Sequence, residues 1–258
     1  MVADLLATAS GLLVGLVLGL LGGGGSILAV PLLLYVVGVA DPHTAIGTSA
    51  VAVAASAAIN LVLHARQGTI KWPCAIAFAV AGSLGALVGA GLGKAVDGQK
   101  LLLAFAVAMI GVGISMLLRK PATGDADVHI SLRLAARLLP TGFFTGMASG
   151  FFGIGGGFLI VPGLIGATNM LMLNAVGSSL VAVTAFGGAT AASYALSGHV
   201  LWDVAGWFVL GGIGGGLLGV RLGSALATRK NVLTRIFAGF IFATAVYIAF
   251  KAWPATFG

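Results

Sequence analysis

The sequence predicts an all-α polytopic membrane protein, and three observations carry that prediction: its composition, its charge content and the length of its apolar runs. Hydrophobic residues make up 59% of the 258 positions and charged residues only 7%, against roughly 25% in soluble domains. The mean hydropathy is +1.14. The apolar runs are continuous and approach the length of membrane-spanning helices, whereas outer-membrane β-barrels show short alternating segments.

The apolar runs form two similar series along the chain. Each series opens with two short apolar segments on either side of a glycine cluster and continues with three longer runs. The short segments lie at 5–21 and 26–39, and again at 138–152 and 157–167. The longer runs lie at 45–63, 73–93 and 101–118, and again at 175–196, 204–220 and 236–250. We therefore expect two halves, each a glycine-broken helical pair plus three transmembrane helices, and about 8–10 membrane helices in total.

The two series are related by an internal repeat. An offset of 131 residues pairs GGGGSILAVP at 22–31 with GIGGGFLIVP at 153–162. After one deletion, an offset of 130 pairs AIGTSAVAVAA at 45–55 with AVGSSLVAVTA at 175–185. Self-similarity of this kind indicates a duplicated unit. We predict a first transmembrane repeat at 1–118, a cytoplasmic linker at 119–137 and a second transmembrane repeat at 138–258.

The distribution of Lys and Arg favours inverted repeats. If each glycine-broken pair enters the membrane and returns, ten of the 13 basic residues lie on one side and only Lys94, Lys100 and Lys251 on the other. If each pair is one broken crossing, the halves are parallel and the 13 residues split seven to six. The positive-inside rule favours the first arrangement, with the linker in the cytoplasm and both termini outside. Re-entrant hairpins and pairs of full crossings have the same parity, so that choice stays open.

The glycines have two kinds of spacing. Gly11, Gly15 and Gly19 are four residues apart, and such stripes let neighbouring helices approach closely. The tight clusters instead break a helix, and we expect new helices to start near Ser26 and Phe158. Their N-termini would present free N–H groups and a positive dipole end to a polar cavity, which suits an anion. The alternative is that the clusters only form tight turns.

Polar side chains interrupt the apolar runs in both halves. The triplets Gly47-Thr48-Ser49 and Gly177-Ser178-Ser179 each follow a loop, where they either cap a helix or line an anion path. Asn60 and Thr190 occupy corresponding positions, and we expect Asn60 to hydrogen-bond a neighbouring helix. His64 falls near a helix end, so we expect it to be solvated.

The residues that most enzymes need are missing from the apolar runs. No acidic residue lies deep in a run, no His/Glu cluster has metal-ligand spacing, and no Ser/His/Asp set is evident. GIGGG lacks the Lys-Ser/Thr ending of a nucleotide-binding P-loop and follows no strand. The net charge of +7 is explained by cytoplasmic loops. We expect no enzyme activity, no cofactor, no metal and no nucleic-acid partner.

Several motifs together resemble the TauE/SafE sulfite exporter family, the TSUP transporters. They are GLLGGGGSILAVP, HTAIGTS, and Gly68 with Trp72, each with a counterpart in the second half. The resemblance implies a secondary transporter in the bacterial inner membrane that exports small sulfur-containing anions such as sulfite or organosulfonates. An anion channel, a carrier of other small carboxylates or oxyanions, and a non-transporting scaffold stay open as alternatives. Coupling of transport to a proton or to sodium stays open as well. The candidate substrate-binding residues are Gly22, Gly23, Gly24, Gly25, Ser26, Thr48, Ser49, Asn60, Gly153, Gly155, Gly156, Gly157, Ser178, Ser179 and Thr190.

Overall fold

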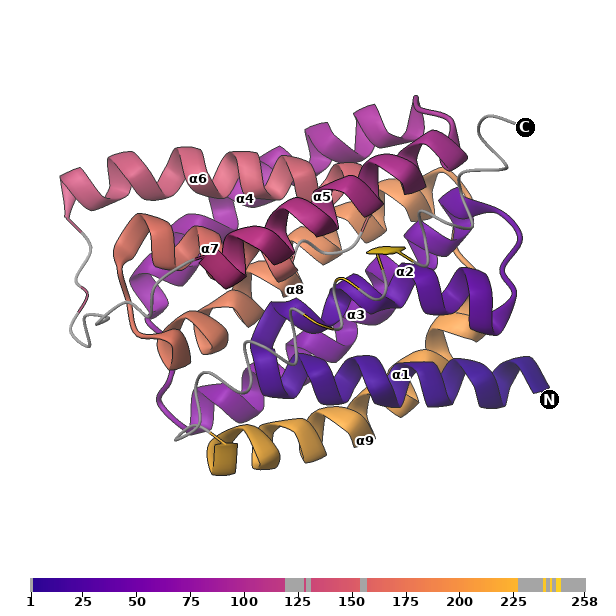
Figure 1. Cartoon of the computed structure of the whole chain (residues 1–258), viewed down its shortest axis with the longest axis horizontal. Helices are drawn as coiled ribbons and strands as arrows, with labels where there is room; N and C mark the ends of the chain where they lie inside the picture. Colours follow the sequence, from indigo (N-terminus) through magenta and orange to yellow (C-terminus); the bar gives the residue numbers. More distant parts are fainter. Residues whose placement is uncertain are drawn as a thin grey trace.

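The regular elements of the chain are helices that pack side by side (Figure 1). The computed structural model describes residues 2–118, 128, 131–153, 157–226, 239, 242, 245 and 246. The first repeat contains α1 (Val2–Leu21), the 3₁₀-helix η1 (Gly22–Leu28), α2 (Ala29–Leu32), the π-helix η2 (Leu33–Val37), α3 (Pro42–Arg66), α4 (Trp72–Lys94) and α5 (Gly98–Leu118). The second contains α6 (Leu132–Phe152), α7 (Gly157–Thr168), α8 (Met172–Leu196) and α9 (Trp202–Leu226).

The predicted class of all-α polytopic membrane protein is confirmed. Within the described ranges, five stretches are long and apolar enough to cross a membrane. They are Val2–Val37, Pro42–Arg66, Trp72–Lys94, Met172–Leu196 and Trp202–Leu222. The helix α6 begins at Leu132, inside the segment predicted as linker. The predicted run 236–250 lies largely outside the described residues.

Both glycine clusters stand where the chain turns back on itself. Gly22, with φ +65°, follows α1. An added Cβ on Gly25 would come within 2.9 Å of Val14 O and 2.8 Å of Leu18 Cα, so the chain returns along α1. Figure 1 shows α2 running back toward the end of the bundle where α1 begins. The second repeat turns in the same way at Gly153, with φ +66°, because an added Cβ on Gly163 of α7 would lie 3.2 Å from Thr145 Oγ1 of α6.

The small-residue stripes bring helices of different repeats together. The helix α1 packs along α9, and α6 packs along α4. The backbone of Gly212 leaves no room for a Cβ on Gly15, and the backbone of Gly82 leaves none on Gly146. These two contacts are related by the offsets 131 and 130. The four-residue spacing therefore forms close helix contacts, as the sequence predicted.

The two repeats also use the same backbone turns. Positive φ angles occur at corresponding positions: Gly22 and Gly153 at +65° and +66°, Gly38 and Asn169 at 86° and 55°, and Gly68 and Gly198 at 68° and 75°. In Figure 1, α1 begins at the right-hand end of the bundle and α6 at the left-hand end. Corresponding helices that run in opposite directions are what inverted repeats require.

Candidate functional site

The helices α3 and α8 pack against each other and carry the two hydroxyl triplets. Asp41 caps α3, because its Oδ2 accepts hydrogen bonds from the Thr44 N–H at 2.8 Å and from Thr44 Oγ1 at 2.6 Å. Thr48 and Ser49 therefore lie within the helix, beyond its first turn. The helix α8 likewise begins at Met172, well before Ser178 and Ser179. The alternative that the triplets cap these helices is wrong, because both helices start earlier than the sequence suggested.

The hydroxyls of Ser178 and Ser179 bind backbone groups of the first repeat. Ser179 Oγ accepts a hydrogen bond from the Gly23 N–H at 3.0 Å and donates one to Val176 O at 2.7 Å. Ser178 Oγ accepts a hydrogen bond from the N–H of Lys71, the residue before α4, at 3.0 Å. Both serine side chains are fully buried. We call these two contacts to Gly23 and Lys71 the α8 hydrogen-bond pair.

The hydroxyls of Thr48 and Ser49 make the corresponding contacts to the second repeat. Thr48 Oγ1 accepts a hydrogen bond from the N–H of Leu201, the residue before α9, at 3.0 Å. Ser49 Oγ donates to Gly153 O at 3.2 Å and to Ile46 O at 2.8 Å. We call the contacts to Leu201 and Gly153 the α3 hydrogen-bond pair. Each repeat thus holds the other at two matching points, a glycine turn and a helix start.

The first glycine cluster is more ordered than the sequence suggested. Gly22 to Gly25 and Ser26 are all buried and lie in the 3₁₀-helix η1. The helical segment therefore begins before Ser26, where the sequence placed its start. Ser26 Oγ donates to Gly23 O at 2.9 Å, and the Gly23 N–H is already bound by Ser179.

The second cluster is described only in part. The helix α7 begins at Gly157, next to the expected start at Phe158. Gly155 and Gly156 lie outside the described residues. The structure therefore places Gly153 at the turn and Gly157 at the helix start, and it tests no role for the two glycines between them.

Asn60 and Thr190 are fully buried but do not join the hydrogen-bond pairs. Asn60 Nδ2 donates to Ser56 O of its own helix at 3.1 Å, in place of the expected bond to a neighbouring helix. Asn60 Oδ1 faces Gly216 of α9, and neither this atom nor Thr190 Oγ1 has a protein partner. These two oxygens are buried acceptors that stay unbound in this conformation.

His64 is not solvated, so that expectation is wrong. Its side chain is 4% exposed and bridges two segments of the chain. Nε2 lies 3.2 Å from Gly19 O and Nδ1 lies 3.3 Å from Thr69 Oγ1. Nothing in the sequence singles out Thr69, because this residue contacts the imidazole from a loop that follows α3.

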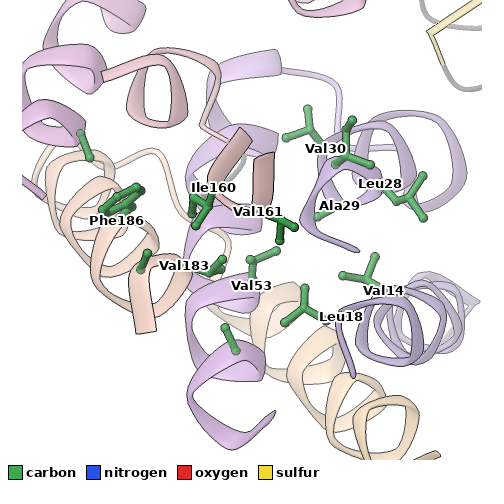
Figure 2. Packing of buried hydrophobic residues seen from close by; sticks show 14 of the residues in the cluster. Val14, Leu18, Leu28, Ala29, Val30, Val53, Ile160, Val161, Val183 and Phe186 are labelled. Atoms are coloured by element: carbon green, nitrogen blue, oxygen red, sulfur yellow. The ribbon is translucent and has the colours of Figure 1, made fainter. Parts of the chain in front are cut away.

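The two glycine-broken elements meet through apolar side chains. In Figure 2, Ile160 and Val161 of α7 lie between Val183 of α8 on one side and Val30 of α2 on the other, with Val53 of α3 below them. All five are buried members of one hydrophobic cluster. In this conformation the hydroxyls of the two hydrogen-bond pairs bind backbone groups, and the side chains labelled between α2 and α7 are apolar.

A bundle of long apolar helices with buried hydroxyl contacts defines an integral membrane protein with several spans. Residues 7–248 match the family model described as sulfite exporter TauE/SafE. The chain belongs to this family of transporters.

The relatives have similar descriptions. The chain is 51% identical over 247 residues to a "Probable membrane transporter protein" of Xylella fastidiosa (strain Temecula1 / ATCC 700964), covering 95% of each chain. It is 26% identical over 244 residues to the "Probable membrane transporter protein YunE" of Bacillus subtilis (strain 168), covering 86% of this chain and 89% of the relative. No solved structure matches the chain.

Proposed function

We propose that the protein is a secondary transporter that exports small sulfur-containing oxyanions, such as sulfite or organosulfonates, across the bacterial inner membrane by alternating access. The family description supports the class of substrate. The observation that carries the mechanism is the presence of two matching hydrogen-bond pairs. Each pair joins one repeat to the glycine turn and to a helix start of the other.

The two pairs act at opposite ends of the bundle. The α8 pair holds the start of α4 and the α3 pair holds the start of α9. The helix α4 runs parallel to α6 and α9 runs parallel to α1, because successive glycine contacts advance in the same direction on both partners. Since α1 and α6 begin at opposite ends in Figure 1, so do α9 and α4. Opening one pair while the other stays closed would expose the centre to one side at a time.

The groups released on opening suit an anion. When the α8 pair opens, the Gly23 N–H at the start of η1 becomes a free donor, and the hydroxyls of Ser178 and Ser179 lose the hydrogen bonds that they accept. Backbone N–H groups at a helix start favour negative charge. Opening the α3 pair would likewise release the N–H of Leu201, while the Ser49 hydroxyl would keep its bond to Ile46 O. Neutral donors of this kind bind a small oxyanion with lower affinity than a buried Lys or Arg would, so the anion can also be released.

Flux through purified protein in liposomes tests this proposal. We expect saturable movement of sulfite or sulfoacetate, with acetate moving at least about tenfold more slowly. Ser49→Ala and Ser179→Ala should each slow the flux about tenfold, since one hydrogen bond of about 1.4 kcal/mol is lost. Ser83→Ala is the matched control, because its hydroxyl donates only to Ala79 O in its own helix.

The result also decides between the alternatives. Flux that does not saturate would indicate an anion channel, and equal rates for acetate and sulfite would contradict the proposed substrate class. If correctly folded protein transports none of the anions, the result would contradict transport and favour the alternative of a non-transporting membrane scaffold.

A further inference from the structure

Three aromatic rings form a compact group where α3 begins and α8 ends. The ring centroid of His43 lies 6.5 Å from that of Tyr194 and 6.1 Å from that of His199. Tyr194 and His199 are 6.4 Å apart, which makes the group a nearly equal-sided triangle. His43 lies on α3, Tyr194 on α8, and His199 in the connection to α9.

Each ring carries a buried polar atom without a protein partner. The atoms are His43 Nδ1, the Tyr194 hydroxyl and His199 Nδ1. Tyr194 as a whole has no exposed surface. Buried polar atoms are nearly always hydrogen-bonded, and three unbonded ones in a single group indicate that the group binds something else. All three atoms are potential donors: the phenol always, and each Nδ1 in the tautomer that carries its proton there.

A lysine supplies positive charge to the same group. Lys94 Nζ lies 5.7 Å from the centroid of the Tyr194 ring. It donates to Ser193 O at 3.2 Å, to Ser193 Oγ at 3.0 Å and to Ser197 Oγ at 3.0 Å, all of them neutral acceptors. The Asp41 carboxylate interacts electrostatically with both His43 and Tyr194, and its Oδ2 accepts hydrogen bonds from Thr44. The ammonium is thus fixed in place by groups that do not neutralise it.

In the other repeat, the two residues that correspond to Tyr194 and His199 are hydrogen-bonded to one another and to backbone. The offset of 130 pairs Tyr194 with His64, His199 with Thr69, and Lys94 with Ser224. There the imidazole of His64 is bonded at both nitrogens, to Thr69 Oγ1 and to Gly19 O. The imidazole of His64 is therefore bonded at both nitrogens, whereas the corresponding group around Tyr194 leaves three polar atoms unbound and has Lys94 beside it.

We propose that His43, Lys94, Tyr194 and His199 form an anion-binding site for a small oxyanion, separate from the hydroxyls of the α3 and α8 pairs. The ring donors bind the oxygens and the Lys94 ammonium supplies the charge. The site adjoins the α3 hydrogen-bond pair, because Leu201, which binds Thr48, is two residues from His199. In the proposed topology it lies at the outer face, where an exported anion leaves. The choice of sulfite as its ligand rests on the proposed function.

Titration of the detergent-purified full chain with sulfite, in the absence of phospholipid, tests the site. Isothermal titration calorimetry should show binding that weakens about tenfold in Lys94→Met and about three- to tenfold in Tyr194→Phe, which removes only the hydroxyl. Lys100→Met is the matched control, since it removes the same charge from an exposed position after the α4–α5 turn, and it should stay within about twofold of wild type. Chloride should bind at least about tenfold more weakly than sulfite, because it offers one acceptor atom to several donors.

Each outcome decides the question. Unchanged sulfite affinity in both variants, in protein that melts like wild type, overturns the site, as does the absence of sulfite binding to wild type. Equal affinity for chloride overturns its specificity for oxyanions. If wild type binds sulfite through Lys94 and Tyr194 but moves none into liposomes, the site stands and the proposed function fails. If the wild-type protein transports sulfite and the two variants bind sulfite as tightly as wild type, the proposed site is wrong but the proposed function stands.

Discussion

Ser179 Oγ accepts a hydrogen bond from the backbone N–H of Gly23 at 3.0 Å, across 156 positions of sequence. The contact joins α8 of the second repeat to the glycine turn of the first. Its counterpart joins Ser49 to Gly153 O at 3.2 Å across 104 positions. A serine that the sequence suggested as a cap or path residue therefore fastens one repeat to the other.

Ser179→Ala tests whether the hydrogen bond between Ser179 and Gly23 stabilises the fold. The change leaves the buried N–H of Gly23 without its partner, and we expect a loss of about 1–3 kcal/mol of stability. The measurement is the apparent melting temperature in detergent. Ser83→Ala removes a hydroxyl that bonds only its own helix and should lower stability by less than about 0.5 kcal/mol. Equal destabilisation by the two substitutions would show that the bond to Gly23 has no special role.

The glycine turn at Gly22 should tolerate no side chain. Its φ is +65°, and an added Cβ would lie 2.6 Å from Val176 O. Gly68 has φ +68°, but an added Cβ there would have no atom within 4 Å. Gly68→Ala therefore measures the cost of the backbone strain without any steric clash. We expect Gly68→Ala to cost about 1–2 kcal/mol and Gly22→Ala to cost more. Gly188→Ala, in an open position within α8, should be neutral or stabilising by up to about 1 kcal/mol. Melting temperatures in any other order would contradict the turn assignment.

The inverted topology predicts opposite labelling of corresponding positions. Arg66 and Leu196 are related by the offset of 130, and both are exposed, Leu196 at 91%. In a Cys74→Ala background, a membrane-impermeant thiol reagent should label Leu196→Cys in intact cells. Arg66→Cys should be labelled only after the cell membrane has been permeabilised. Labelling of both positions from the same side would show that the repeats are parallel.

The cap of α3 predicts a dependence of stability on pH. Burial alone would raise the pKa of the Asp41 carboxyl, but hydrogen bonds from Thr44 and the nearby His43 hold the pKa below its ordinary value of 3.8. The stabilisation from this charge is therefore complete above pH 3.8 and is lost as the pH falls through the folded-state pKa. Asp41→Asn keeps a capping side chain but cannot ionise. Its melting temperature should fall below that of wild type at pH 6 and approach it at pH 3. A constant difference over this range would rule out the titration of Asp41 as the cause.

Much of the fold could be predicted from the sequence, because apolar run length and repetition are local properties that a single chain displays. The start of α7 near Phe158 and the close packing at Gly15 and Gly146 follow from glycine spacing alone. The returning course of the chain at Gly22 does not follow, because a turn and a crossing use the same residues. The distribution of Lys and Arg favoured the return, and the contact of Gly25 with α1 shows it in the structure.

The candidate site was predicted less completely, because partners far apart in sequence leave no local signal. The sequence pointed to Ser179, Ser49 and the glycine turns, but nothing local shows that Leu201 and Lys71 supply the N–H groups for Thr48 and Ser178. The burial of His64 was missed for the same reason, since its partner Gly19 lies 45 positions away. The group around Tyr194 is assembled from three separate segments.

Counterflow in liposomes tests the central claim, that the two hydrogen-bond pairs alternate in a carrier. Vesicles loaded with unlabelled sulfite and diluted into a trace of ³⁵S-sulfite should accumulate the label transiently above its equilibrium level, because a carrier exchanges substrate between its two sides. Ser179→Ala should reduce that accumulation while Ser83→Ala should not. Label that only equilibrates, without overshoot, would contradict alternating access and indicate a channel, and no entry of label would contradict transport altogether.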